Sequence, residues 1–238
     1  MKAGEQQPLQ NHIVEFRKRL IRIVIAAAAG FAIAYAFSEN IFRWMSVPLS
    51  NSLGPDGSLI FTGLTEMFFV YVKVGFFFGL AIAAPYIFYQ IWGLVSPAIP
   101  QRNRAFILLS VIFSCILFIG GVLFGFFFVF PLIFKFLLGY ANEQIAALPS
   151  VKEYLSLSFK LLIAFGIVFE VPVLVFFLSR LGVVSVDGFR RNRKFAILFA
   201  FIIAAILTPD VVSQFMMAIP IILLYELGIF VAMISGGK

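Results

Sequence analysis

The sequence predicts an all-α protein that crosses a membrane six times, and three observations support this fold class. The composition is 62% hydrophobic and 12% charged, with a mean hydropathy of +1.06, whereas soluble domains average about 45–50% apolar and about 25% charged residues. The apolar residues gather into six runs separated by polar stretches. The basic residues also concentrate in alternate polar stretches. We therefore expect a single membrane-embedded domain over residues 1–238.

The six apolar runs set the expected spans. A helix rises about 1.5 Å per residue, so about 20 residues cross a hydrocarbon core about 30 Å thick. The predicted spans are residues 20–37, 67–92, 106–138, 154–181, 195–208 and 214–234. Pro85 predicts a kink in the second span. The third span is longer than a bilayer needs, so we expect it to tilt, to bend at Pro131 or to project beyond the membrane. The fifth span is short and the sixth has a short unbroken apolar part, so we expect them to thin the bilayer locally.

A basic amphipathic stretch, NHIVEFRKRLIR, precedes the first span. At 100° per residue its apolar side chains share one face and most of its charged ones share the other, while Arg17 projects into the apolar face. Arg17 is either a snorkelling side chain or a positioned cation. Glu15 either pairs with Lys18 and Arg19 at helical spacing or offers its carboxylate to an incoming guanidinium, whose fork-like geometry an ammonium does not share.

A long loop, from Ser38 to Glu66, is expected after the first span. It contains a short amphipathic piece, IFRWMSVPL, that includes Pro48, and a GPDG turn.

The distribution of basic residues predicts the orientation of the chain. With the N-terminus in the cytoplasm, the inner segments hold 13 of the 18 Lys and Arg residues, while the outer loops hold Arg43 and Lys152 with six acidic residues. Cytoplasmic loops of membrane proteins carry an excess of Lys and Arg. We therefore expect both termini in the cytoplasm.

The sequence offers little for catalysis, a metal or a cofactor. The single histidine, His12, lies outside the spans, and no Cys/His cluster or phosphate-binding glycine loop is present. Cys115 lies in an apolar run and has no second cysteine with which to form a disulfide. No basic face interleaved with aromatic residues lies outside the spans, so nucleic acid is not expected as a partner. We expect no enzymatic activity and no cofactor.

Polar residues at membrane depth form a second candidate set. Glu170 lies within an apolar stretch of 18 residues, where a charged side chain costs about 2.5–3.5 kcal/mol on insertion scales. It is either a neutral, hydrogen-bonded core acid or a contact for a partner helix or a transported segment. Thr208, Asp210 and Gln214 lie at the turn between the fifth and sixth spans. Asp210 or Ser213 is also suited to cap the sixth helix.

Short motifs occur in order along nearly the whole chain, and they are IVEFRKRL (residues 13–20), SVPL around Pro48, APYIFYQIW (84–92), SPA (96–98), FPLIFKFL (130–137), YLS at Tyr154, FGIVFEVPV (165–173) and LTPDVVSQ through AIP (207–220). In their order and spacing these motifs resemble the TatC family of twin-arginine translocase subunits. Each motif alone is weak, but the ordered set is specific.

The resemblance implies a glove-shaped bundle of six transmembrane helices in the cytoplasmic (inner) membrane. It further implies a subunit that binds twin-arginine signal peptides and recruits single-span TatA- and TatB-like partners into an oligomeric complex, which exports folded proteins using the proton-motive force. The signal-peptide site would include Glu15, Arg17, Arg19 and the loop of residues 94–104 with Leu94 and Asn103. The intramembrane and partner surface would include Glu170, Thr208, Asp210 and Gln214, and Pro48 would be structural.

Two positions depart from the family pattern. Asn103 stands where the family usually has a second carboxylate, and Leu94 stands where an aromatic side chain is common. Recognition of paired arginines would then depend more on Glu15. A proton-coupled transporter of a small solute, with Glu170 as the coupling group, is the alternative function, although the sequence has no clear internal repeat to support it.

Overall fold

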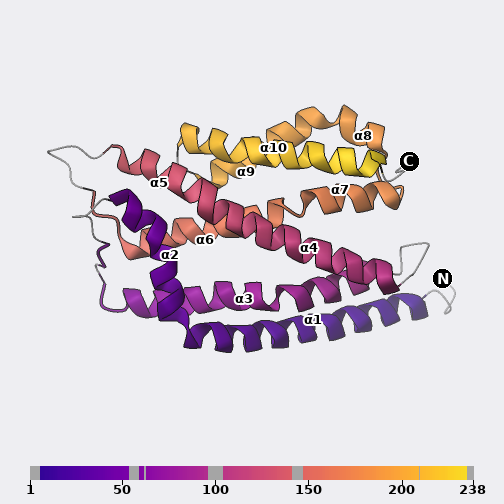
Figure 1. Ribbon diagram of the computed structural model, residues 1–238. Helices are drawn as coiled ribbons and strands as arrows, with labels where there is room; N and C mark the ends of the chain where they lie inside the picture. Colours follow the sequence, from indigo (N-terminus) through magenta and orange to yellow (C-terminus); the bar gives the residue numbers. More distant parts are fainter. Residues whose placement is uncertain are drawn as a thin grey trace. The chain divides into compact units, whose positions relative to one another are not determined.

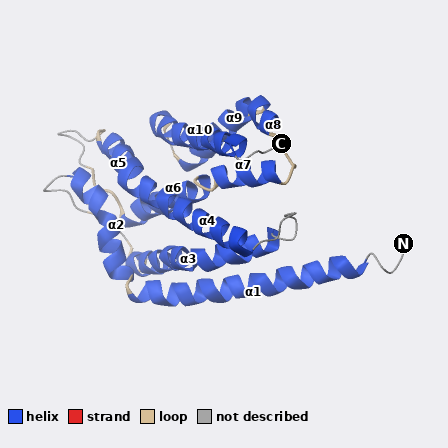
Figure 2. Cartoon of the chain, turned by 45° about the vertical axis from the view of Figure 1, so that its right-hand side comes forward, coloured by secondary structure: helices blue, strands red, loops and turns tan. Residues whose placement is uncertain are grey.

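The computed structural model describes residues 6–53, 59–61, 63–95, 104–140, 147–208 and 210–234. Helices make up nearly all of these ranges (Figures 1 and 2). In chain order they are α1 (Gln6–Ala36), α2 (Ser38–Leu53), α3 (Glu66–Val95), α4 (Arg104–Phe124), the π-helical turn η2 (Gly125–Val129), α5 (Phe130–Leu138), α6 (Val151–Val168), α7 (Val171–Arg180), α8 (Val186–Arg191), α9 (Arg193–Leu207) and α10 (Val211–Ile234).

The all-α, multi-span fold class is confirmed. Within the described residues, five helical stretches are long and apolar enough to cross a membrane, and they cover residues 14–36, 66–94, 108–138, 151–180 and 211–234. The remaining predicted span corresponds to α9, which has 15 residues and therefore a length of about 22 Å. The placement of all residues in one membrane domain remains a prediction.

Near the N-terminus, the structure contradicts one prediction, the long loop after the first span. The amphipathic stretch and the first span form one continuous helix, α1, because no glycine or proline separates them. The segment expected to be a long loop begins with the 16-residue helix α2, which continues through Pro48. Ser46, Ser50 and Ser52 each donate a hydroxyl hydrogen bond to the carbonyl four residues earlier, so polar side chains of α2 are satisfied within the helix.

Prolines explain two breaks in the long spans. The break in the third span lies at η2, where Phe130 N–H donates to the Gly125 carbonyl five residues earlier. Pro131 follows directly, and a proline has no N–H for the regular hydrogen bond. The fourth span breaks between α6 and α7 at residues 169–170, and Pro172 is the second residue of α7. The helix α3, in contrast, is continuous through Pro85.

The chain forms two compact units. The first unit holds residues 1–41 and 71–115, and the second holds residues 42–70 and 116–238. In the first unit α1 and α3 run side by side (Figures 1 and 2). Their backbones meet at Gly30 and Gly79: a Cβ at Gly79 would lie 2.6 Å from the Cα of Phe31, and a Cβ at Gly30 would lie 3.1 Å from the Gly79 carbonyl carbon. Glycine at both positions is what permits this approach.

In the second unit α10 packs along α7 and α9. Val175, Val186, Phe189, Ile229 and Ala232 form one buried apolar cluster there. Many apolar side chains of the helices remain exposed, such as Phe199 and Ile206 on α9. In a multi-span membrane protein such surfaces face lipid or a partner helix, because hydrocarbon solvates them as well as a protein core does.

The approach of α1 to α3 generates a stability prediction. We expect Gly79→Ala to lower the free energy of unfolding by about 1–3 kcal/mol, because the new methyl group overpacks against the α1 backbone. Gly120→Ala in α4 is the matched control, since a Cβ there meets nothing within 4 Å. Unfolding in mixed micelles measures both changes. Equal effects of the two substitutions would contradict the close approach.

Candidate functional site

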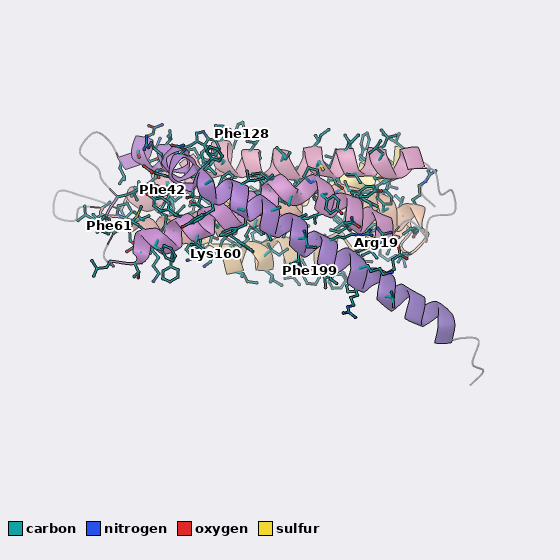
Figure 3. All side chains as sticks on the ribbon, turned by 90° about the horizontal axis from the view of Figure 1, so that it is seen from below. Arg19, Phe42, Phe61, Phe128, Lys160 and Phe199 are labelled. Atoms are coloured by element: carbon teal, nitrogen blue, oxygen red, sulfur yellow. The ribbon has the colours of Figure 1, made fainter. Side chains whose placement is uncertain are left out.

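The first candidate site lies in the motif IVEFRKRL of α1, where Glu15 and Arg19 form an ion pair. Both Nε and Nη2 of Arg19 donate to Oε1 of Glu15, at 3.1 and 2.7 Å. The Glu15 side chain is 47% exposed, whereas that of Arg19 is 19% exposed. The pair therefore presents its carboxylate outward and its guanidinium inward. Figure 3 labels Arg19 on α1.

Arg19 also contacts α3, which the sequence analysis did not foresee. Its Nη1 donates to the backbone carbonyl of Gln90 at 3.3 Å and to Oε1 of the Gln90 side chain at 3.4 Å. Gln90 is 2% exposed. The guanidinium also lies against Gly93, where a Cβ would be 2.8 Å from Arg19 Cζ. Arg19 thus links Glu15 on α1 to the C-terminal part of α3.

The close approach of Gly30 to Gly79 accounts for this contact. Arg19 precedes Gly30 by eleven residues, and Gln90 follows Gly79 by eleven. Eleven residues are about three helical turns, so two antiparallel helices that touch at the glycines meet again on the same faces at Arg19 and Gln90. The Glu15–Arg19 ion pair looks local to α1, but it is tied to a second helix through Gln90.

The other residues that were predicted for this site do not contact the Glu15–Arg19 pair in any interaction described above, or they lie outside the described residues. Arg17 is exposed on α1, and Leu94 is half-buried, one residue beyond Gly93. Asn103 and most of the loop of residues 94–104 lie outside the described residues. The structure therefore brings together Glu15 and Arg19 from the predicted set and adds Gln90 and Gly93.

The second candidate set is partly structural. The Thr208 hydroxyl is buried and donates to the Ala204 carbonyl of its own helix at 2.9 Å. Gln214 Nε2 donates to the Phe201 carbonyl at 3.0 Å, which ties α10 to α9. Oδ2 of Asp210 accepts the Ser213 N–H at 2.6 Å. The prediction that Asp210 caps the last helix is confirmed, while the partner role of these residues remains a prediction.

Glu170 lies at the break between α6 and α7. It is half-buried, and its backbone carbonyl accepts the Leu174 N–H at 2.9 Å at the start of α7. Nearby, the ring of Phe169 packs against Phe124 at a centroid distance of 5.5 Å. Irregular backbone inside a membrane span is tolerated only where it is buried in protein or lines a water-filled cavity, so the break at residues 169–170 favours a protein-facing environment for this acid.

A buried carboxylate, Glu66, organises the start of α3 and was missed. One oxygen of Glu66 accepts the Ser150 hydroxyl and the Lys152 N–H, each at 2.9 Å, and the other accepts the Gly63 N–H at 3.2 Å. Ile60 also forms a bridge with Ser150 through backbone hydrogen bonds. The sequence gives only a weak signal, an acid at the beginning of an apolar run.

The end of α2 that carries Pro48 belongs to the same unit. Pro48 is half-buried beside the fully buried Leu49. The hydroxyl of Tyr154 on α6 donates to the Met45 carbonyl, and Trp44 stacks on Phe126 at 4.2 Å. Pro48 thus lies in a helix held on both sides, in keeping with a structural role.

A further ion pair joins α9 and α10. Arg193 Nη2 lies 2.7 Å from Oε2 of Glu226, and both side chains are more than a third exposed. Such exposed pairs contribute little, about 0.2–1 kcal/mol. Among the described residues, no group of three or more His, Cys, Asp or Glu side chains is placed to hold a metal ion.

Comparison with known protein families identifies the family to which this chain belongs. The sequence model described as "Sec-independent protein translocase protein (TatC)" matches residues 11–220. The chain belongs to the TatC family. The TatC protein of Desulforapulum autotrophicum is 46% identical over 98% of this chain and 87% of its own length. The TatC protein of Escherichia coli K12 is 36% identical over 100% of this chain and 93% of its own length.

Solved structures agree with this family. The crystal structure described as the twin arginine translocase receptor TatC superposes with a TM-score of 0.85 at 39% identity, covering 94% of this chain and 99% of that one. As a TatC-family protein, the chain is a component of a protein translocase in the membrane and not an enzyme. The resemblance found in the sequence motifs is confirmed.

The turn between α9 and α10 generates a prediction that separates capping from partner contact. We expect Asp210→Ala to lower the free energy of unfolding by about 0.5–2 kcal/mol, because the Ser213 N–H loses its acceptor. Asp210→Asn keeps an acceptor oxygen and should retain most of the stability. Unfolding in mixed micelles measures both. Equal losses for the two variants would contradict the capping role.

Proposed function

We propose that this chain is the receptor and scaffold subunit of a twin-arginine translocase. It binds twin-arginine signal peptides of folded cargo at the site around Glu15, and it recruits TatA- and TatB-like single-span partners. The observation that carries the proposal is the exposed Glu15 carboxylate in a TatC-family chain. This carboxylate is hydrogen-bonded to the more buried guanidinium of Arg19. The excess of basic residues in alternate loops supports cytoplasmic positions for both termini.

The basic residues around Glu15 repel a cationic ligand, so binding depends on the geometry of its hydrogen bonds to the Glu15 carboxylate. Arg17, Lys18, Arg19 and Arg22 surround the single acid on α1, so a ligand with two arginines meets a region of like charge. Only a specific contact offsets that repulsion. Two parallel N–H···O bonds from a guanidinium to a carboxylate provide one, and an ammonium does not form them. The pattern favours paired arginines over paired lysines.

The partner surface is proposed on α9 and α10, with Glu170 at the α6–α7 break as the intramembrane contact. The helix α9 buries only Ala200 and Ala204, so most of its apolar surface is left for another helix or for lipid. The two small residues Ala200 and Ala204 are buried within the chain, where they let α9 approach its own neighbours closely. Thr208 and Gln214 bond within the α9–α10 pair, so their proposed role is to fix the shape of the surface that a single-span helix meets.

The guanidinium role of Glu15 is tested by peptide binding. We expect Glu15→Ala to weaken binding of a fluorescent twin-arginine peptide by about 10-fold or more, because a hydrogen bond to a charged group is worth about 1.5–3 kcal/mol. Glu15→Asp should lose less, because it keeps the carboxylate. Fluorescence anisotropy with the detergent-solubilised protein measures the dissociation constants.

The control for this experiment is Glu153→Ala, which removes an exposed acid from the first turn of α6. It should bind the peptide as the parent does. Identical affinities for Glu15→Ala, Glu15→Asp and the parent would overturn the proposed site.

The missing acid at residue 103 gives a second test. We expect Asn103→Glu to tighten binding of the same peptide by up to about 5-fold, because an added exposed ion pair contributes about 0.2–1 kcal/mol. The gain should shrink at high ionic strength, where salt screens exposed charges. Asn103→Gln, which changes length without charge, is the control. A gain shared by both variants would show that charge is not the cause.

A further inference from the structure

Two residues of α3 form a seat for the Arg19 guanidinium. Gln90 supplies two acceptors, its backbone carbonyl and its side-chain oxygen. They accept hydrogen bonds from Arg19 Nη1 at 3.3 and 3.4 Å, respectively. Gly93 supplies space, because a Cβ there would lie 2.8 Å from Cζ and 3.1 Å from Nη2 of Arg19. Any larger side chain at residue 93 would push the guanidinium off the helix.

The seat fixes both edges of one rigid group. The guanidinium is planar and presents its five N–H donors in a fixed fork. With Nη1 held by Gln90, the opposite edge, formed by Nε and Nη2, points to a single oxygen of Glu15. The orientation of the exposed carboxylate is therefore set by a buried glutamine on another helix.

We propose that Gln90 and Gly93 are positioning residues for recognition of a guanidinium ligand at Glu15. This inference rests on the proposed receptor function and adds how the site tells arginine from lysine. A mobile carboxylate attracts an ammonium and a guanidinium alike, whereas a fixed one is preorganised for the two parallel hydrogen bonds that only a guanidinium makes. Loss of the contacts from Gln90 and Gly93 therefore reduces the preference for arginine over lysine more than it reduces the affinity for a cationic ligand.

The contacts of Arg19 with Gln90 and Gly93 join residues that are far apart in the sequence, so no local pattern predicts them. Gln90 lies 71 residues from Arg19, and neither it nor Gly93 belongs to a charge pattern. The seat exists because α1 and α3 touch at Gly30 and Gly79 and keep the same register three turns later.

The test uses three variants of the full chain. Gln90→Leu removes the side-chain acceptor at similar volume, Gly93→Ala fills the space below the guanidinium, and Gln90→Glu keeps an acceptor oxygen and serves as the conservative rescue. Gly120→Ala, at a glycine with open space around it, is the control for adding a methyl group to a helix. Dissociation constants are measured for a twin-arginine peptide and for its twin-lysine counterpart.

We expect the ratio of the two constants to fall at least about 3-fold in Gln90→Leu and Gly93→Ala and to stay near the parent value in Gln90→Glu and Gly120→Ala. A defect in folding alone would reduce the amount of binding protein and leave the ratio unchanged. Ratios equal to the parent's in both seat variants, with the parent discriminating, would overturn the positioning role alone. A parent that binds neither peptide would overturn the receptor function, and this inference with it.

The Nε–Hε resonance of Arg19, assigned by its loss in Arg19→Lys, provides a readout without peptide. In the parent it should have the shift of a carboxylate-bonded group, and in Gly93→Ala it should move toward the solvent-exposed position. An unchanged resonance in Gly93→Ala would overturn the seat, even where that variant unfolds more readily than the parent.

Discussion

The close backbone contact between α1 and α3 is the constraint on which the candidate receptor site depends. Helices whose side chains separate them lie about 8–10 Å apart, whereas glycine at both Gly30 and Gly79 removes the side chains at the contact. This contact fixes the register of two antiparallel helices. The same register brings Arg19 over Gly93 and within reach of Gln90. A packing feature in the apolar part of the first unit thus sets the polar geometry at its end.

The sequence predicted the parts of the fold that depend on composition. Apolar runs gave the spans, because a helix that long and that apolar has few other stable environments. Pro131 marked the region of one break, although η2 lies just before this proline and not at it, and the break beside Pro172 was not predicted. The helix α2 was missed because its polar serines resemble a loop, and the structure shows that their hydroxyls bond within the helix. Local patterns alone did not reveal that compensation.

The candidate site was predicted only where its residues are close in sequence. The spacing of Glu15 and Arg19 indicated their pairing, and the position of Asp210 before α10 indicated its cap. Glu66, Gln90 and Gly93 were missed, because their partners lie far away along the chain and depend on helix packing. Glu66, for example, meets Ser150 at a separation of 84 residues. Such contacts carry no periodic signal, so sequence reading reaches them only through a family resemblance.

The Glu15–Arg19 pair also shows why a carboxylate in a basic region remains useful. An isolated Glu15 among four cations would be drawn toward whichever side chain was nearest, and its direction would vary. The hydrogen bonds from Arg19 to Gln90 hold this one cation beside Glu15 on the buried side of α1. Both of the Arg19 hydrogen bonds go to one carboxylate oxygen, Oε1 of Glu15. Under the proposed receptor function, a ligand arginine would meet a carboxylate whose direction is set before binding, so the free-energy cost of ordering that side chain would fall on folding and not on binding.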